Sequence, residues 1–254
     1  IFNPEDLNAL EQALRIRDRL PGSTVTLLTM GPGRAADIIR EGFFRGADDG
    51  ILLSDRAFAG SDTLATSYAL AQAIRKVGAV DLIVAGRQAI DGDTAQVGPQ
   101  VAEKLNLPQV TYVEEVLEIA ENRMVLKRRL EQGVEMVSAP LPLLITVNGT
   151  APECRPRNVK LLMKYKHAKT VSEIQLAAED YLHLYNNRPY LNIREWSVNQ
   201  IETDSAQLGL EGSPTKVKKI DNVVLQAKDS RRISPNDEEI EDLMKELITS
   251  HTIG

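Results

Sequence analysis

Short apolar runs alternate with segments of helical apolar spacing through the first hundred residues, and this alternation limits the fold more than any other feature. The predicted strands are 25–30, 51–53 and 82–85, and the predicted helices lie within 7–16, 35–45, 62–74 and 97–105. Strands that alternate with helices imply right-handed crossovers and a parallel sheet. The near-continuous apolar character of the strands agrees, because helices cover a parallel sheet on both faces. The predicted class is therefore α/β, with a mostly parallel sheet flanked by helices.

The pattern changes after Pro108, where strand-like runs follow one another with almost no helix between them. These runs occupy 110–119, 124–130, 134–137 and 143–147. The turn residues Glu121-Asn122 and Gln132-Gly133 separate the first three runs. Strands joined by tight turns pair antiparallel, so this part of the chain is predicted to extend the sheet with antiparallel strands.

The composition shifts again at Ala151, where prolines and lysines become frequent and the apolar periodicity weakens. Domain boundaries fall where the pattern of a compact core ends, so a boundary is predicted near residue 150. We expect an α/β core over 1–150, a loop and insertion over 151–200, and a C-terminal arm over 201–254.

The C-terminal arm contains one strong helical signal. Ser234 and Pro235 are typical of a helix N-cap and of the first helical position. An apolar stripe at helical spacing follows, formed by Ile240, Leu243, Met244, Leu247 and Ile248. Fully burying each such side chain contributes roughly 1.5–3 kcal/mol, so the helix needs a surface to lie against. Either the core of the same chain or a partner subunit can supply that surface.

The composition excludes several classes of function. The formal net charge of −6 argues against broad nucleic-acid binding, because polyphosphates select basic surfaces. No run of eighteen apolar residues is present, so no membrane span is predicted. The single cysteine, Cys154, fits a reducing cytoplasm, and the three histidines are too scattered to predict a metal site. The first residue is not Met, so the true start is predicted to be missing.

The segment from Arg87 to Pro99 is the candidate site for chemistry. It follows an apolar run and precedes a helical pattern, and such a loop is where α/β proteins bind nucleotides. Gly92 and Gly98 would let the backbone approach a ligand closely. The first amide groups of the following helix, which begins near Val97, carry partial positive charge that attracts phosphate.

Side chains of the same loop divide by charge. Thr94 and Gln96 can donate hydrogen bonds to phosphate or ribitol oxygens, whereas Asp91 and Asp93 repel phosphate and suit loop braces, helix caps or ribose acceptors. A plain capped turn between a strand and a helix is the alternative. Neither a G-x-S-x-G elbow nor a Walker lysine is present, so the sequence favours a bound cofactor over direct attack on a substrate.

Two further features are weaker. Gly31-Pro32-Gly33-Arg34 is the equivalent turn after the first predicted strand, and it would form the floor of an adenine pocket if the two strands are neighbours. A basic run from Arg155 to Lys169 surrounds Leu161, Leu162 and Met163. Such a run is either a solvated charged face or an apolar knob ringed by cations that docks an acidic partner.

Several segments resemble the β subunit of electron-transfer flavoproteins. Those that match in order are Asn3-Pro4 before a helix, Met30-Gly31-Pro32, Gly46-Ala47-Asp48, Gln88-Ala89-Ile90-Asp91, Arg128-Arg129-Leu130-Glu131-Gln132-Gly133-Val134-Glu135 and Pro142-Leu143-Leu144-Ile145-Thr146. The resemblance runs from Ile1 to about Lys219 and implies an adenine-nucleotide-hydrolase-like, Rossmann-like fold. It also implies that the family's opening strand is absent before Ile1, which would leave the sheet and the cofactor site incomplete.

Two stretches, 91–99 and 209–217, resemble the electron-bifurcating branch of that family in particular. The resemblance implies a cytoplasmic heterodimer with an α subunit, in which the β-subunit site holds FAD and receives a hydride from NADH. One electron would pass through the FAD of the α subunit to an acyl-CoA dehydrogenase, and the other to ferredoxin or flavodoxin. Non-bifurcating members hold structural AMP in the same site. A nucleotide-binding stress-type domain without a redox role is the second alternative.

The resemblance also assigns residues by position. The cofactor-binding set is Asn3, Met30, Gly31, Asp91, Gly92, Asp93, Thr94, Gln96, Val97 and Gly98, with the first three at the adenine–ribose end. The partner-recognition set is Arg157, Lys160, Leu161, Leu162 and Met163. The C-terminal arm would wrap around the α subunit, which suits its apolar stripe.

Overall fold

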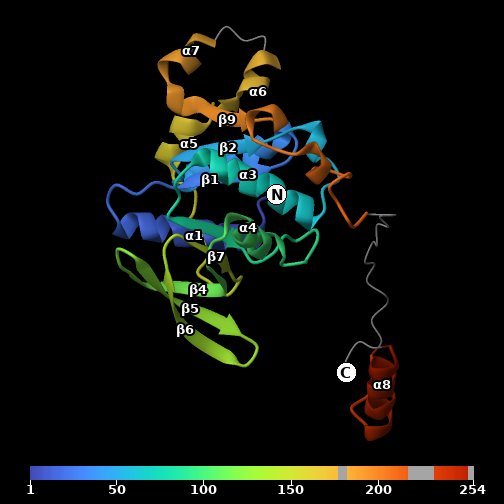
Figure 1. Cartoon of the computed structure of the whole chain (residues 1–254). Coiled ribbons are helices and arrows are strands. Elements are labelled where there is room, and N and C mark those ends of the chain that lie inside the picture. The colour runs from blue at the N-terminus through green and yellow to red at the C-terminus, as the bar shows by residue number, and fades with distance from the viewer. Residues whose placement is uncertain (177–181, 217–231, 251–254) are drawn as a thin grey trace. The chain divides into compact units, whose positions relative to one another are not determined.

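The structure, a computed structural model, describes residues 1–176, 182–216 and 232–250 (Figure 1). The chain divides into two compact units, 1–216 and 217–254. The described helices are α1 Pro4–Arg19, α2 Ala36–Arg45, α3 Thr63–Val77, α4 Val97–Leu105, α5 Val159–Tyr165, α6 Val171–Leu176, α7 Leu182–Asn187 and α8 Asp237–Thr249. The described strands are β1 Thr26–Met30, β2 Asp49–Leu53, β3 Leu82–Gly86, β4 Gln109–Ile119, β5 Arg123–Leu130, β6 Gly133–Pro140, β7 Leu143–Val147, β8 Lys169–Thr170 and β9 Asn192–Trp196.

The described strands of the first unit form two sheets. One has the order β1-β2-β9-β8 and is parallel throughout. The other has the order β3-β7-β4-β5-β6, in which β3, β7 and β4 are parallel and β5 and β6 are antiparallel. The predicted α/β class with an antiparallel extension is confirmed. The parallel strands, however, belong to two sheets, and β1 and β3 each end one of them.

Strands β8 and β9 come from the segment after residue 150. β9 pairs with β2, from Ile51 beside Arg194 to Leu53 beside Trp196. This segment therefore completes the first sheet. As a result, the division between the two units lies between residues 216 and 217.

Helix α1 connects the two sheets. Figure 1 shows it running between the layer of β1 and β2 and the strands β7 and β4. Leu10 and Leu14 pack in a core cluster with Ile39 and Leu52, whereas Ala9 packs in the cluster of the second sheet. Full burial of a leucine side chain contributes roughly 1.5–3 kcal/mol. Apolar burial on two sides of α1 therefore ties the two sheets together.

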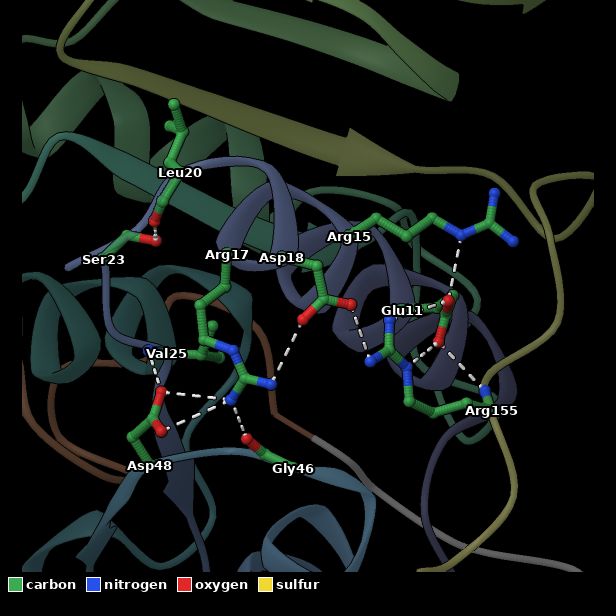
Figure 2. A network of polar contacts seen from close by, with 10 residues as sticks. All are labelled: Glu11, Arg15, Arg17, Asp18, Leu20, Ser23, Val25, Gly46, Asp48 and Arg155. Carbon is green, nitrogen blue, oxygen red and sulfur yellow. Dashed lines mark hydrogen bonds and ion pairs between the residues drawn. The ribbon is translucent and has the colours of Figure 1, made fainter.

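A polar network lies along α1, as Figure 2 shows. The Glu11 carboxylate accepts hydrogen bonds from Nε of Arg155 and Nε of Arg15, both at 2.9 Å, and from the Arg155 backbone N–H at 3.0 Å. Arg155 also pairs with Asp18 at 2.9 Å. Burial alone would raise the pKa of Glu11, but the hydrogen bonds from the two arginines outweigh it and lower that pKa. The network fixes the segment that follows β7 onto α1.

Glu11→Gln is expected to make stability less dependent on pH in the acid range. A carboxyl group with a lowered folded pKa stabilises the fold above its unfolded pKa and loses that contribution as pH falls through the folded pKa. Wild-type protein should therefore lose more free energy of unfolding than Glu11→Gln between about pH 5 and pH 3. Urea denaturation across this range measures the difference, with Glu121→Gln at an exposed turn as control. Equal pH slopes for wild type and Glu11→Gln would contradict the prediction.

The second unit contains α8. Its N-cap is Asn236, whose Oδ1 accepts the Glu239 backbone N–H at 2.8 Å. The cap predicted at Ser234 is therefore wrong by two residues, because the asparagine side chain reaches the first-turn amide that a cap must satisfy. No residue of α8 is buried. Exposed apolar side chains of the predicted stripe are Ile240 (44%), Met244 (43%) and Ile248 (56%).

Candidate functional site

The predicted loop follows β3 and lies open on the surface. Its first residue continues the sheet, because the Arg87 N–H donates to Val147 O at 2.9 Å. The next turn is closed by a hydrogen bond from Asp93 N to Ala89 O at 3.0 Å. Asp93 and Ala95 have φ values of 48° and 53°, in the left-handed region that residues other than glycine rarely adopt. Residues 89–94 are all exposed, so packing does not seal the loop.

Helix α4, which follows the loop, begins without a side-chain cap. Gln96 occupies the cap position and makes no capping hydrogen bond. The neighbouring helix α3 differs, because the Asp62 carboxylate accepts from the Leu64 and Ala65 amides at 2.9 and 3.1 Å. Thr63 Oγ1 donates to Gln96 Oε1 at 2.9 Å, which joins the starts of the two helices. The positive end of α3 is thus compensated by a carboxylate, whereas that of α4 has no side-chain cap.

The two glycines of the loop have different roles. A Cβ at Gly98 would lie 2.7 Å from Thr146 Cγ2, so this glycine allows α4 to pack closely on β7. A Cβ at Gly92 would meet nothing within 4 Å. Gly98 is buried against the sheet, and its lack of a side chain is explained by helix–strand packing. Gly92 therefore remains the glycine that a ligand could approach.

The first turn of α1 braces the start of the loop. Asn3 Nδ2 donates to Gln88 O at 2.9 Å and to Asp6 Oδ2 at 3.0 Å. Asn3 Oδ1 is buried and has no hydrogen-bond partner. Burial raises the pKa of the Asp6 carboxyl, against the hydrogen bond that Gly86 N donates to it at 2.7 Å. The predicted residue Asn3 thus lies at the loop, and its buried side-chain oxygen has no hydrogen-bond partner.

Sequence reasoning missed two carboxylates of that turn, Glu5 and Asp6. The Glu5 carboxylate accepts from Arg87 Nε at 3.1 Å and from the Gln88 backbone N–H at 3.0 Å. Acidic residues are common in the first turn of a helix because they complement the helix dipole. Their presence in the sequence therefore did not predict that Glu5 and Asp6 contact the end of β3 and the loop.

Met30 and Gly31 belong to the other sheet. Met30 ends β1, and the Gly31 N–H donates to Leu53 O at 3.0 Å, which extends the pairing of β1 with β2. The hydrogen-bonded strands therefore place these residues at the end of the first sheet and the loop of 87–99 at the end of the second. Their expected role at the adenine end of the ligand stays a prediction.

The segment 209–215 is clamped onto the start of α3. Ser213 Oγ accepts the Asp62 N–H at 2.8 Å and donates to Gly209 O at 2.6 Å. The Thr215 N–H and hydroxyl both donate to Asp62 Oδ2, at 3.0 and 2.7 Å. Residues 209–215 of the second stretch that resembles the bifurcating branch are thereby held at the start of α3.

The predicted partner-recognition residues lie on and before α5. Asn158 caps this helix, and the Arg157 guanidinium pairs with Glu41. Met163 is 57% exposed and Lys160 is exposed, whereas Leu161 is partly buried and packs against the first core cluster. The apolar side chains that this helix presents to solvent are therefore Val159 and Met163 rather than Leu161.

Other kinds of site find no support in the described ranges. No group of three or more His, Cys, Asp and Glu residues there could hold a metal ion. No helix of 1–176, 182–216 or 232–250 is long and apolar enough to cross a bilayer. Shallow cavities lie beside Glu114 and Arg129 and beside Tyr68 and Ser213, and no residue of the loop lines them. The loop and the uncapped helix remain the candidate site.

Comparison with known proteins points in one direction. The electron transfer flavoprotein domain matches residues 1–179. The electron transfer flavoprotein subunit beta of Megasphaera elsdenii is 40% identical over 261 residues, covering 98% of this chain and 88% of that protein. The acryloyl-CoA reductase electron transfer subunit gamma of Anaerotignum propionicum is 40% identical over 264 residues, covering 100% of this chain and 88% of that protein. The caffeyl-CoA reductase-Etf complex subunit CarD of Acetobacterium woodii is 53% identical over 146 residues, covering 58% of this chain and 55% of that protein. The chain belongs to the electron transfer flavoprotein family, among its beta subunits.

Proposed function

We propose that this chain is the β subunit of a heterodimeric electron carrier and holds FAD at the loop of residues 87–99. The observation that carries the proposal is the uncapped start of α4 beside an open loop. The first amides of α4 have no carboxylate of their own, whereas those of α3 are capped by Asp62. Helix N-termini of this kind bind phosphate in α/β proteins.

The residues around the loop fit an adenine nucleotide. A diphosphate would accept hydrogen bonds from the amides of Val97 and Gly98 and from the exposed Thr94 side chain. An adenine amino group or a ribose hydroxyl would satisfy Asn3 Oδ1, which is otherwise buried without a partner. Asp93 acts as a brace, because its carboxylate accepts from Gln88 Nε2 at 2.7 Å. That contact supports a role for Asp93 in shaping the loop.

The chemistry of the proposed cofactor needs no catalytic side chain from this protein. A bound flavin accepts a hydride or single electrons, and the protein supplies binding and orientation. NADH is the proposed donor. The proposed acceptors are an acyl-CoA dehydrogenase, reached through the FAD of the α subunit, and ferredoxin or flavodoxin. The similarity to subunits of caffeyl-CoA reductase and acryloyl-CoA reductase complexes supports an acyl-CoA-linked partner.

Helix α5 is the proposed docking element for the acyl-CoA dehydrogenase. The exposed side chains of Val159 (75%) and Met163 (57%) lie among Lys160, Lys164 and Lys166. An apolar contact ringed by cations favours an acidic partner surface and a fast, reversible encounter. The proposed surface therefore suits a transient electron-transfer complex better than a permanent one.

Structural AMP in the same site is the second candidate, since AMP would use the same adenine and phosphate contacts. Counting flavin in the heterodimer decides between them. The chain is co-expressed with its α subunit, and FAD, AMP and NADH oxidation are measured on the purified complex. Two FAD per heterodimer with NADH oxidation is the expected result. One FAD with bound AMP would select the second candidate, and neither nucleotide at the β-subunit site would overturn the proposal.

A further inference from the structure

The surroundings of the loop are acidic, although the proposed ligand is an anion. Residues 87–99 contain two carboxylates, Asp91 and Asp93, and one basic residue, Arg87. The first turn of α1 adds Glu5 and Asp6 beside the loop. Carboxylates repel phosphate, so the amide dipoles of the loop have to act against several negative charges. A cation at this position would change the balance more than any further dipole.

Arg87 is held in place from several sides. Its backbone N–H is bonded to Val147 O at 2.9 Å, so the Cα position is fixed by the sheet. The Glu5 carboxylate accepts a hydrogen bond from Arg87 Nε at 3.1 Å and forms an ion pair with Arg87 Nη2 at 3.1 Å. The Tyr112 ring lies under the guanidinium, with 5.9 Å between Cζ and the ring centroid. Among the described residues no group forms a hydrogen bond or ion pair with Arg87 Nη1. This edge of the guanidinium is therefore available to a ligand oxygen.

Tyr112 adopts a conformation that a bulky residue rarely adopts. Its φ is 61°, in the left-handed region, within a register shift between Val110 and Val113 where β4 pairs with β7. Its N–H donates to Thr146 Oγ1 at 3.3 Å, instead of continuing a regular ladder. Strained residues of this kind persist where the surrounding structure requires a particular side-chain position. The strain brings the ring to the carboxyl end of β7, where Arg87 lies.

We propose that Arg87 pairs with the phosphate of the bound nucleotide and that Tyr112 is a positioning residue that holds its guanidinium there. The inference rests on the proposed nucleotide site and adds the source of its positive charge. Glu5 fixes one edge of the Arg87 guanidinium, and the Tyr112 ring packs against its face. Together they orient the other edge before the ligand binds. The alternative is that Arg87 only braces α1 against β3 through Glu5.

The experiment compares AMP with uncharged adenosine as ligands of the complete heterodimer freed of nucleotide. Arg87→Met is expected to weaken AMP binding about 10-fold or more, since a charge-assisted hydrogen bond is lost, and to leave adenosine binding unchanged. The fall of AMP affinity with salt concentration should also become shallower. Arg87→Lys should recover part of the loss.

Tyr112→Leu is expected to weaken AMP binding about 2–5-fold, whereas Tyr112→Phe should match wild type. In the Arg87→Met background, Tyr112→Leu should have no further effect.

A stability comparison tests the strain separately. Tyr112→Gly should unfold about 2–4 °C above Tyr112→Ala, because glycine adopts a left-handed φ without cost. At the adjacent strand residue Thr111 the order should be reversed, with the alanine variant more stable than the glycine variant. The opposite order at Tyr112 would overturn the account of its conformation.

The outcomes separate this inference from the function on which it rests. If Arg87→Met lowers Tm but keeps the wild-type ratio of AMP to adenosine affinity, Arg87 is only a brace and this inference is overturned alone. If the wild-type heterodimer binds neither AMP nor FAD at the β-subunit site, the proposed function fails and this inference fails with it.

Discussion

Gly86→Ala is expected to lower the free energy of unfolding and to weaken nucleotide binding together. A Cβ at this position would lie 2.8 Å from Asp6 N and 2.8 Å from Glu5 C, both backbone atoms of the first turn of α1. Backbone cannot rotate away as a side chain does, so α1 must shift. Overpacking of this kind costs about 1–3 kcal/mol. Each kcal/mol lowers Tm by about 2–4 °C in a chain of this size.

The same shift would disturb the site. Asn3 and Glu5 reach the loop only from their present place on α1, through their bonds to Gln88. Thermal unfolding and titration with AMP therefore measure two consequences of one change. Gly92→Ala is the matched control for stability, because its Cβ would meet nothing within 4 Å. If Gly86→Ala were as stable as Gly92→Ala, the close approach of α1 to β3 would be refuted.

We propose that α8 docks on the α subunit, as the family resemblance implies, so Met244→Asp is expected to weaken assembly with that subunit by at least about 30-fold. Met244 is in the middle of the apolar stripe and is 43% exposed. A hot-spot residue at the centre of an interface contributes about 2 kcal/mol or more, and burying a carboxylate in place of Met244 adds a desolvation cost. The dissociation constant of separately purified subunits, measured by titration calorimetry, reports the change.

The control for this variant lies on the same helix. Asp242 is exposed and lies outside the stripe, so Asp242→Ala should leave the dissociation constant within about 2-fold, as expected for a rim position. Thermal unfolding of the isolated chain should be the same for Met244→Asp and wild type, since no residue of α8 is buried. A normal dissociation constant for Met244→Asp would show that the stripe does not contact the α subunit.

Local patterns in the sequence were enough to locate the loop. An apolar run before Arg87 and helical spacing from Val97 correctly predicted β3 and α4, because strand and helix periodicities are properties of neighbouring residues. The amphipathic pattern of the tail likewise predicted α8. The exact cap was missed, because Ser234 and Asn236 both suit that position and only the backbone course selects one.

Gly98 shows where local reasoning stops. The sequence suggested a glycine that admits a ligand, whereas the structure places it against Thr146 of β7. The order of strands in a sheet is set by contacts between distant segments, and turn chemistry does not encode it. The place of Met30 and Gly31 in a separate sheet from the loop has the same origin.

Alternating apolar runs, turn residues and family motifs by themselves determined the α/β class, the elements up to residue 147 and the loop proposed to bind the nucleotide. Only the tertiary structure decided which side chains meet at that loop. Asn3 and Gln88 are 85 residues apart in the chain, and Tyr112 reaches Arg87 only through a strained residue of β4. Such contacts depend on how helices and strands pack in space, because a packed core selects one arrangement from many that share the same periodicity.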